Sequence, residues 1–212
     1  MSKIAFTGAS GSGKTTLVKF VAKEFNIEHF SGSSGDLKID SDRKYLFDKY
    51  GFKGNEGHLN VIQESHKNPD FGYELQCIIQ ERRAELIRDV DNFITDRSPL
   101  DNWVYFLLQS APYQNDKVIH EFLRKCINAM ANLDIVIYIP SLIPIEDNGS
   151  RVPVLHYQKA VDAIFEKYWV EFKVELEVMG AKTVMSKIAS MDLEIRKKLV
   201  GRLIKNYHEQ AY

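Results

Sequence analysis

The segment Gly8-Ala9-Ser10-Gly11-Ser12-Gly13-Lys14-Thr15 lies near the N-terminus of the sequence. It follows a short apolar run rich in strand formers, Lys3–Thr7. It precedes a segment in which apolar residues recur at helical spacing, namely Leu17, Phe20, Val21 and Phe25. The order of strand, glycine loop and helix is typical of a fold in which strands and helices alternate.

This stretch satisfies the pattern G-x-x-x-x-G-K-[ST] and stands between a strand and a helix, the context that the pattern requires. Its glycines let successive backbone N–H groups turn inward around phosphate oxygens at a helix N-terminus. We expect Lys14 to reach the β- and γ-phosphates of ATP and the Thr15 hydroxyl to ligate Mg²⁺. The alternative, a glycine-rich turn with an incidental lysine, does not account for the complete pattern. The predicted nucleotide-binding residues are Gly8, Ser10, Gly11, Ser12, Gly13, Lys14, Thr15 and Thr16.

Further along the chain, strand-like and helix-like segments alternate. Strands are predicted over 3–7, 26–30, 92–95, 134–139 and 181–185. Helices are predicted over 15–25, 43–50, 58–67, 73–90, 100–108, 117–131, 157–178 and 191–207, with a loop at 141–156. This order predicts an α/β fold, the three-layer sandwich of a P-loop NTPase, in which a mostly parallel five-stranded sheet has helices on both faces. We expect a single domain over residues 1–212.

The composition fits one such domain. The chain has 212 residues, of which 44 % are hydrophobic, and a formal net charge of -1. Its overall field therefore gives no reason for strong attraction to nucleic acid or to an anionic membrane. Cys77 and Cys126 are too few for a disulfide framework and fit a reducing compartment. Because the sequence shows neither a leader nor an apolar run of about 18 residues, we expect a cytoplasmic protein without membrane contact.

Asp96 and Arg97 follow the strand predicted at 92–95. A carboxylate at that strand end would lie near the metal held by Thr15, bonding a metal-bound water or orienting an attacking hydroxyl. Arg97 can hold an acceptor or transferring phosphate through two hydrogen bonds and offset the charge that develops during transfer. The alternative is that Asp96 caps the next helix and that Arg97 is a solvated surface residue. We predict catalytic roles for Lys14, Asp96 and Arg97, with Thr15 and Asp96 at the metal.

Two further motifs resemble those of a known group of enzymes. The first, Phe93-Ile94-Thr95-Asp96-Arg97-Ser98-Pro99-Leu100-Asp101-Asn102, resembles the Asp-Arg-Ser segment of P-loop kinases acting on nucleosides and nucleotides. The second, Ile143-Pro144-Ile145-Glu146-Asp147-Asn148-Gly149-Ser150-Arg151, resembles a loop of the small AAA-type P-loop group, which includes the nicotinamide riboside kinase domain and many phage kinases. The resemblance spans residues 3 to about 185. It implies a lid-like loop at about 141–156 on which Arg151 approaches the nucleotide as a catalytic residue, and an exposed surface arginine is the alternative.

The region that would bind the acceptor departs from the known families. Deoxynucleoside kinases present a glutamate followed by proline after the second strand, and thymidylate-type kinases present an Arg-Glu-Pro segment. This chain has Glu28-His29-Phe30-Ser31-Gly32-Ser33 there, so neither acceptor assignment transfers. Gln76, Gln80 and Arg83 share one face of the helix predicted at 73–90. They would bind a base edge and a phosphate if that face lined the acceptor pocket, but we favour a solvated helix face.

The leading hypothesis is an ATP-dependent kinase whose acceptor is a small-molecule nucleoside, nucleotide or nucleotide-like compound. A kinase of a hydroxymethylated base within DNA is the related alternative, because phage members of the similar group carry out such chemistry. An excess of basic residues near the C-terminus slightly favours a DNA acceptor, although most such runs are solvated helix faces. These residues are Lys187, Arg196, Lys197, Lys198 and Arg202.

An ATP-dependent switch is the third hypothesis. Against it, Ser98 and Pro99 follow Asp96-Arg97, where a second acidic residue would favour hydrolysis. Monomer and homodimer are both left open.

Overall fold

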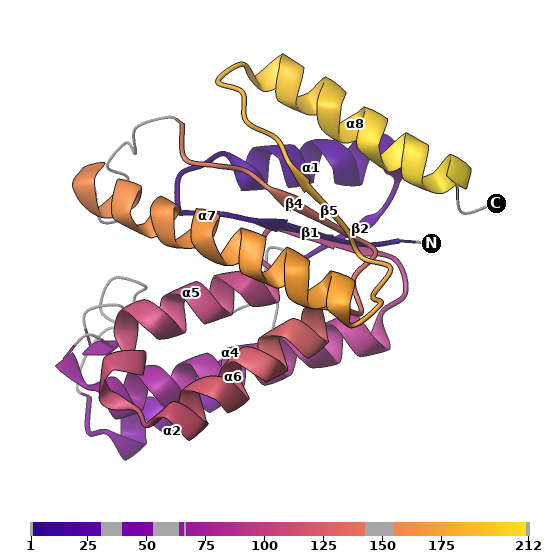
Figure 1. Ribbon diagram of the computed structural model, residues 1–212. Coiled ribbons are helices and arrows are strands. Elements are labelled where there is room, and N and C mark those ends of the chain that lie inside the picture. Colours follow the sequence, from indigo (N-terminus) through magenta and orange to yellow (C-terminus); the bar gives the residue numbers. More distant parts are fainter. Residues whose placement is uncertain (1, 31–39, 53–63, 66, 143–154, 211–212) are drawn as a thin grey trace.

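The computed structural model describes residues 2–30, 40–52, 64–65, 67–142 and 155–210. Its strands are β1 (Lys3–Thr7), β2 (Glu28–Phe30), β3 (Phe93–Thr95), β4 (Ile135–Tyr138) and β5 (Val184–Lys187) (Figure 1). Its helices are α1 (Lys14–Phe25), α2 (Asp40–Lys49), α4 (Pro69–Asp89), α5 (Pro99–Gln109), α6 (Asp116–Met130), α7 (Leu155–Val178) and α8 (Leu193–Gln210), with a 3-10 turn, η1 (Ala111–Tyr113). Each predicted strand is present, although the last begins at Val184 instead of 181. The helix predicted at 58–67 lies mostly outside the described residues.

The five strands form one sheet in the order β2-β3-β1-β4-β5. β1 pairs with β3, where Ala5 aligns with Thr95, and with β4, where Thr7 aligns with Tyr138. Every pairing is parallel, so the predicted five-stranded parallel sheet is confirmed. Because parallel strands run in the same direction, the loops that follow β1 and β3 leave the sheet at the same edge.

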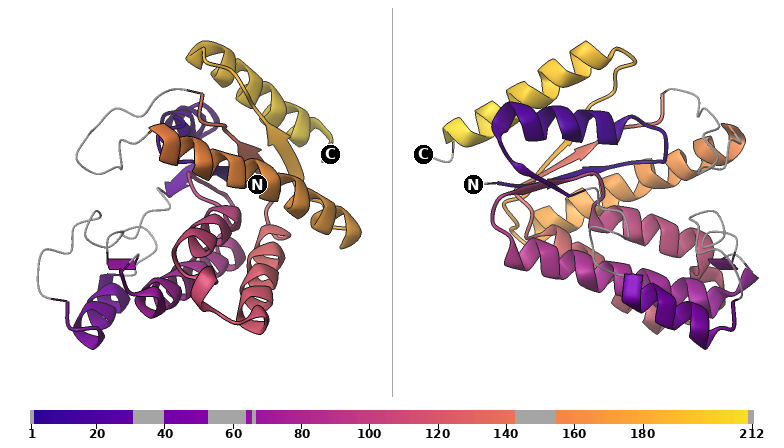
Figure 2. Two further views of the ribbon diagram at one scale, coloured as in Figure 1. Left: turned by 60° about the vertical axis from the view of Figure 1, so that its left-hand side comes forward. Right: turned by 180° about the vertical axis from the view of Figure 1, so that it is seen from behind.

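Helices cover both faces of the sheet and give the predicted three layers (Figure 1, Figure 2). α1 and α8 pack together on one face, while α4, α5, α6 and α7 lie on the other. In β1, Ile4 and Phe6 belong to the core under α1 and α8, whereas Ala5 belongs to the core of the opposite layer. Successive strand residues point to opposite faces, so the continuously apolar strands are buried on both sides.

α4 begins earlier than the sequence pattern predicts. Asn68 caps the helix, because its side chain accepts a hydrogen bond from the backbone N–H of Phe71. Pro69 then occupies the first turn, where its missing N–H removes no helical hydrogen bond. The helix therefore starts at Pro69 instead of 73. None of the helices in the described parts of the chain combines the length and hydropathy that crossing a bilayer requires.

Candidate active site

The loop between β1 and α1 has a backbone conformation that depends on its glycines. Gly8, Gly11 and Gly13 have φ angles of 137°, 81° and 91°, in the region that residues with a Cβ rarely adopt. A Cβ at Gly8 would also lie 2.4 Å from the backbone oxygen of Ile139. The close approach of this loop to the end of β4 therefore requires glycine at position 8.

Gly8→Ala is expected to lower the free energy of unfolding by at least about 3 kcal/mol, because backbone strain and a backbone clash act together. Thermal unfolding followed by circular dichroism measures the loss. Gly201→Ala in α8 is the control, since a Cβ there meets nothing within 4 Å. Alanine in a helix interior stabilises by up to about 1 kcal/mol over glycine. Equal melting temperatures for Gly8→Ala and wild type would contradict the steric argument.

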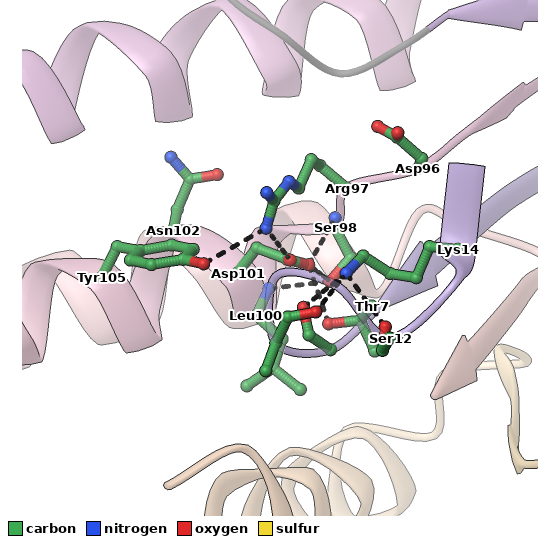
Figure 3. A network of polar contacts seen from close by, with 12 residues as sticks. Thr7, Ser12, Lys14, Asp96, Arg97, Ser98, Leu100, Asp101, Asn102 and Tyr105 are labelled. Atoms are coloured by element: carbon green, nitrogen blue, oxygen red, sulfur yellow. Dashed lines mark hydrogen bonds and ion pairs between the residues drawn. The ribbon is translucent and has the colours of Figure 1, made fainter. Parts of the chain in front are cut away.

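Lys14 is the first residue of α1, and its ammonium lies inside the loop (Figure 3). Nζ donates to the backbone oxygens of Gly8 at 2.7 Å and Ala9 at 2.8 Å, and to Ser12 Oγ at 3.3 Å. The side chain is buried, and a buried ammonium requires such acceptors. The loop thus holds a positive charge beside the space in which it would enclose a phosphate.

Thr15 and Asp96 connect the phosphate loop to the end of β3. Thr15 Oγ1 donates to Asp96 Oδ2 at 2.7 Å. Asp96 is only 8 % exposed, and its other oxygen, Oδ1, is buried and makes no hydrogen bond to any residue that the structure describes. Oxygen atoms of carboxylates and hydroxyls are the ligands that Mg²⁺ prefers. The pair therefore fits a magnesium ion, with Asp96 Oδ1 available to the ion or to a water bound to it.

Asp101, for which the sequence analysis predicts no role, holds the segment after β3 in place (Figure 3). Oδ2 accepts hydrogen bonds from Ser98 N at 2.9 Å, Ser98 Oγ at 3.1 Å and Thr7 Oγ1 at 2.7 Å. Oδ1 accepts from Arg97 Nη1 at 3.0 Å. Ser98 is the N-cap of α5 and forms a capping box with Asp101, so Asp96 is not the cap of this helix. The signal in the sequence was a serine followed three residues later by an acidic residue.

Asp101→Asn is expected to lower the free energy of unfolding by about 2–3 kcal/mol. The asparagine amide has one acceptor oxygen and one NH₂ group with two N–H donors. In either orientation, its NH₂ therefore faces a group that now donates to a carboxylate oxygen. Urea denaturation measures the change. Asp89→Asn is the matched control and should leave the midpoint unchanged, because Asp89 lies on the exposed end of α4 and forms a surface ion pair with Arg88. Equal midpoints for the two variants would contradict this assignment.

Arg97 is held beside the same carboxylate. Its Nη1 also lies 3.5 Å from Tyr105 Oη, and the guanidinium is 5.5 Å from the centre of the Tyr105 ring. Burial lowers the pKa of Arg97, but Tyr105, Asp101 and Asp96 raise it more, so its pKa is above the ordinary value. The side chain is 26 % exposed rather than fully solvated. Among the described residues both of its hydrogen bonds use Nη1, which leaves Nε and Nη2 to a ligand.

The face of α4 that carries Gln76, Gln80 and Arg83 is buried, so the predicted solvated face is wrong. The reason is that α5 and α6 pack against this helix. Asn102 Nδ2 donates to Gln76 Oε1 at 3.4 Å, and Arg83 Nη1 donates to the backbone oxygen of Ser98 at 3.1 Å. Burial lowers the pKa of Arg83 to about 10. Through Arg83, this polar face of α4 contacts the segment after β3.

The predicted solvated basic stretch near the C-terminus is also partly wrong. Arg196 is buried against the phosphate loop, where its Nη1 donates to the backbone oxygen of Ser12 at 2.6 Å. Lys187 forms an ion pair with Glu166, and Lys197 forms one with Glu194 at 2.7 Å. Three of the basic residues are exposed, as predicted: Lys187, Lys198 and Arg202.

Most of the predicted site residues meet at the carboxyl edge of the sheet. The loop residues lie between β1 and α1, Thr15 and Thr16 are exposed in the first turn of α1, and Asp96 and Arg97 follow β3. Arg151 and most of the loop predicted at 141–156 lie outside the described residues. The described part of the site is therefore the phosphate loop together with the segment after β3.

Comparison with known proteins identifies the family. The sequence model of the AAA domain family matches residues 3–186. The chain belongs to the AAA domain family. No curated protein matches the sequence.

Solved structures share the fold of this AAA domain. Deoxyadenosine kinase from M. mycoides with bound dATP has a TM-score of 0.60 and 14 % identity over 96 % of this chain and 99 % of that chain. Shikimate kinase from Acinetobacter baumannii in complex with shikimate has a TM-score of 0.51 and 12 % identity over 97 % of this chain and 94 % of that chain. Identities this low show the fold alone, which is that of P-loop kinases, as predicted. The narrower resemblance to nicotinamide riboside kinase and phage kinases stays a prediction.

Proposed function

We propose that this chain is an ATP-dependent kinase that moves the γ-phosphate to a nucleoside, nucleotide or nucleotide-like acceptor. The observation that carries the proposal is the 2.7 Å hydrogen bond between Thr15 Oγ1 and Asp96 Oδ2. This bond joins Thr15, the last residue of the phosphate-loop motif, to the buried carboxylate of Asp96 at the end of β3. A glycine-rich turn without a ligand would have no need of that carboxylate. Phosphoryl transfer with a divalent cation does need one.

The nucleotide side of the proposed reaction is formed by the phosphate loop. Backbone N–H groups of the loop would bind the phosphates, and Lys14 would exchange its loop acceptors for oxygens of the β- and γ-phosphates. Thr15 and Asp96 would hold magnesium, because the buried Asp96 Oδ1 has no hydrogen-bond partner in the described residues. When bound with the nucleotide, magnesium supplies positive charge that offsets the charge on the phosphate oxygens.

The acceptor side of the proposed reaction begins at Arg97. Asp101 and Tyr105 fix one edge of its guanidinium, and its other N–H groups would bind the phosphoryl group or an acceptor phosphate in a bidentate manner. An acceptor oxygen then bonds to the γ-phosphorus while the bond from that phosphorus to the β–γ bridging oxygen breaks. ADP leaves, and the proton of the acceptor hydroxyl passes to solvent. Arg97 is positioned to lower the cost of the charge that develops.

A nucleoside-like acceptor is supported by amide groups of α4 and of α5, the helix that begins just after Arg97. Asn102 follows Asp101 in α5, and its Oδ1 is buried and has no hydrogen-bond partner among the residues that the structure describes. Its Nδ2 donates to Gln76 Oε1 at 3.4 Å. A buried amide oxygen without a partner is unfavourable, and an N–H group of a base would satisfy it. The likeness to a deoxyadenosine kinase is in keeping with this acceptor class.

Nothing in the described residues specifically favours a DNA acceptor or a nucleotide-dependent switch. Of the basic residues that favoured a DNA acceptor, Arg196 is buried and Lys187 and Lys197 are paired with glutamates. A switch would require the nucleotide to be hydrolysed by water. Arg97, which Asp101 holds through a hydrogen bond, is better suited to orienting an acceptor.

The test is whether acceptors stimulate ADP formation. A coupled assay follows ADP release from ATP and Mg²⁺ alone, and then with nucleosides, nucleoside monophosphates, nicotinamide riboside, shikimate or hydroxymethylated DNA. We expect slow release in buffer and an increase of at least about 100-fold with one small-molecule class, because positioned acceptors gain greatly over water. ADP release that no acceptor changes would overturn the kinase proposal and favour a switch.

A further inference from the structure

Arg196 is a buried cation on a helix face whose other buried residues are apolar. It lies in α8 at helical spacing from Val200 and Ile204, which pack against α1 and the sheet. The residue is only 2 % exposed, and burial lowers the pKa of its guanidinium. In the described parts of the chain, no carboxylate forms an ion pair with it. A buried charge without a counter-ion is costly.

The guanidinium of Arg196 joins the phosphate loop to the loop that precedes α8. Nη1 donates to the backbone oxygen of Ser12 at 2.6 Å, and Nε donates to the backbone oxygen of Ser190. Nη1 also lies 3.1 Å from the position that a Cβ on Gly13 would occupy. α8 packs beside α1 on the same face of the sheet (Figure 1, Figure 2). Arg196 thus contacts the phosphate loop from the α8 side.

These contacts determine how one peptide group of the loop is oriented. The described peptide bonds include no cis bond, and in a trans peptide the C=O of one residue and the N–H of the next point in opposite directions. Because Arg196 holds the Ser12 oxygen towards α8, the N–H of Gly13 is directed to the opposite side. Gln158 of α7 acts similarly on the Ser10 oxygen, to which its Nε2 donates at 3.4 Å.

The charge of Arg196 would also act on an anion bound in the loop. Its Nη2 is buried without a hydrogen-bond partner among the described residues, so the site holds a positive charge with which no described carboxylate forms an ion pair. Interactions between charges are strong where water is excluded. An anion enclosed by the loop would supply the missing negative charge from the other side of the Ser12–Gly13 peptide.

We propose that Arg196 is a positioning residue of the phosphate loop: it directs the Gly13 N–H towards the bound phosphates and places a buried positive charge behind them. This inference rests on the proposed nucleotide-dependent function. Arg196 acts through the loop and does not touch the reacting atoms. The substrate group that it serves is the polyphosphate, not the base or the ribose.

The test compares the affinity for two probes, MgATP and inorganic triphosphate, by isothermal titration calorimetry. Arg196→Met keeps a long apolar side chain but removes the charge and both hydrogen bonds. We expect both dissociation constants to rise by similar factors of about ten or more, since a hydrogen bond to a charged group contributes roughly that much. Arg202→Met, at an exposed position of the same helix, is the control and should bind both probes like wild type.

Three outcomes would overturn the proposal. In the first, folded Arg196→Met binds both probes within about twofold of wild type. In the second, ATP binding weakens and triphosphate binding does not, which would assign Arg196 to the base or ribose. In the third, used if Arg196→Met does not fold, Arg196→Gln, which removes the charge but keeps a polar side chain, binds both probes within about twofold of wild type. Wild type that binds neither probe would instead refute the proposed function and this inference with it.

Discussion

Lys14→Met is expected to lower kcat for phosphoryl transfer by about 1,000-fold, the range found when a group that stabilises transferred charge is removed. The ammonium lies 2.7 Å and 2.8 Å from two backbone oxygens of the phosphate loop, so it is already next to the phosphates that the loop would bind. Methionine has a similar length and no charge. The fall in kcat should therefore exceed any change in KM for ATP. Steady-state kinetics with the acceptor found in the panel measures both.

Lys19→Met is the matched control for Lys14→Met. Lys19 lies on the exposed side of the same helix, so its replacement removes an equal charge from α1 without touching the phosphate loop. Its kcat should equal that of wild type. A folded Lys14→Met enzyme with kcat within about threefold of wild type would show that the buried ammonium has no part in transfer.

Asp96→Asn is expected to lower kcat by about 100- to 1,000-fold and to weaken the apparent affinity for Mg²⁺ by about 10- to 100-fold. Asparagine has almost the same shape and can still accept a hydrogen bond from Thr15, which now donates at 2.7 Å. The variant therefore removes the charge with little change in packing. Titration of activity with Mg²⁺ at saturating ATP separates the loss in metal affinity from the loss in rate.

Asp91→Asn provides the control for Asp96→Asn. Asp91 lies before β3 and Asp96 lies after it, so the two carboxylates are at opposite ends of one strand. The Asp91 side chain is 80 % exposed and lies 3.6 Å from the ammonium of Lys3. We expect wild-type kcat and Mg²⁺ dependence for this variant. If Asp96→Asn had the same Mg²⁺ dependence as Asp91→Asn, the assignment of Asp96 to the metal would be wrong.

Much of the fold follows from local sequence signals. β1 was predicted with its observed bounds because an apolar run of strand formers ends at the glycine loop. The apolar run of β4 was equally clear, since a strand buried on both faces needs no alternation. The parallel sheet then follows from the alternation of strands with helices. The start of α4 differs from the prediction because a proline, Pro69, is compatible with the first turn of a helix.

The site was only partly predictable, for a physical reason. Lys14, Asp96 and Arg97 belong to local motifs, whereas the burial of Gln76 and Arg196 depends on elements distant in the sequence. Amphipathic patterns assign polar residues to the solvent. In the structure, however, α5 and α6 pack against the helix that carries Gln76, and Arg196 contacts the phosphate loop. The spacing of Arg196 with Val200 and Ile204 was the available signal that it lies on a buried face.

In the proposed reaction, this site transfers the γ-phosphate of ATP to an acceptor. The most direct measurement follows the label of γ-³²P-ATP into products with nucleosides, nucleoside monophosphates, nicotinamide riboside and hydroxymethylated DNA, for wild type and Asp96→Asn. We predict a labelled phosphoester of one small-molecule acceptor that is lost in Asp96→Asn, and no label from α-³²P-ATP. Label that appears only as inorganic phosphate, or an equal amount of phosphoester with Asp96→Asn, would contradict the claim.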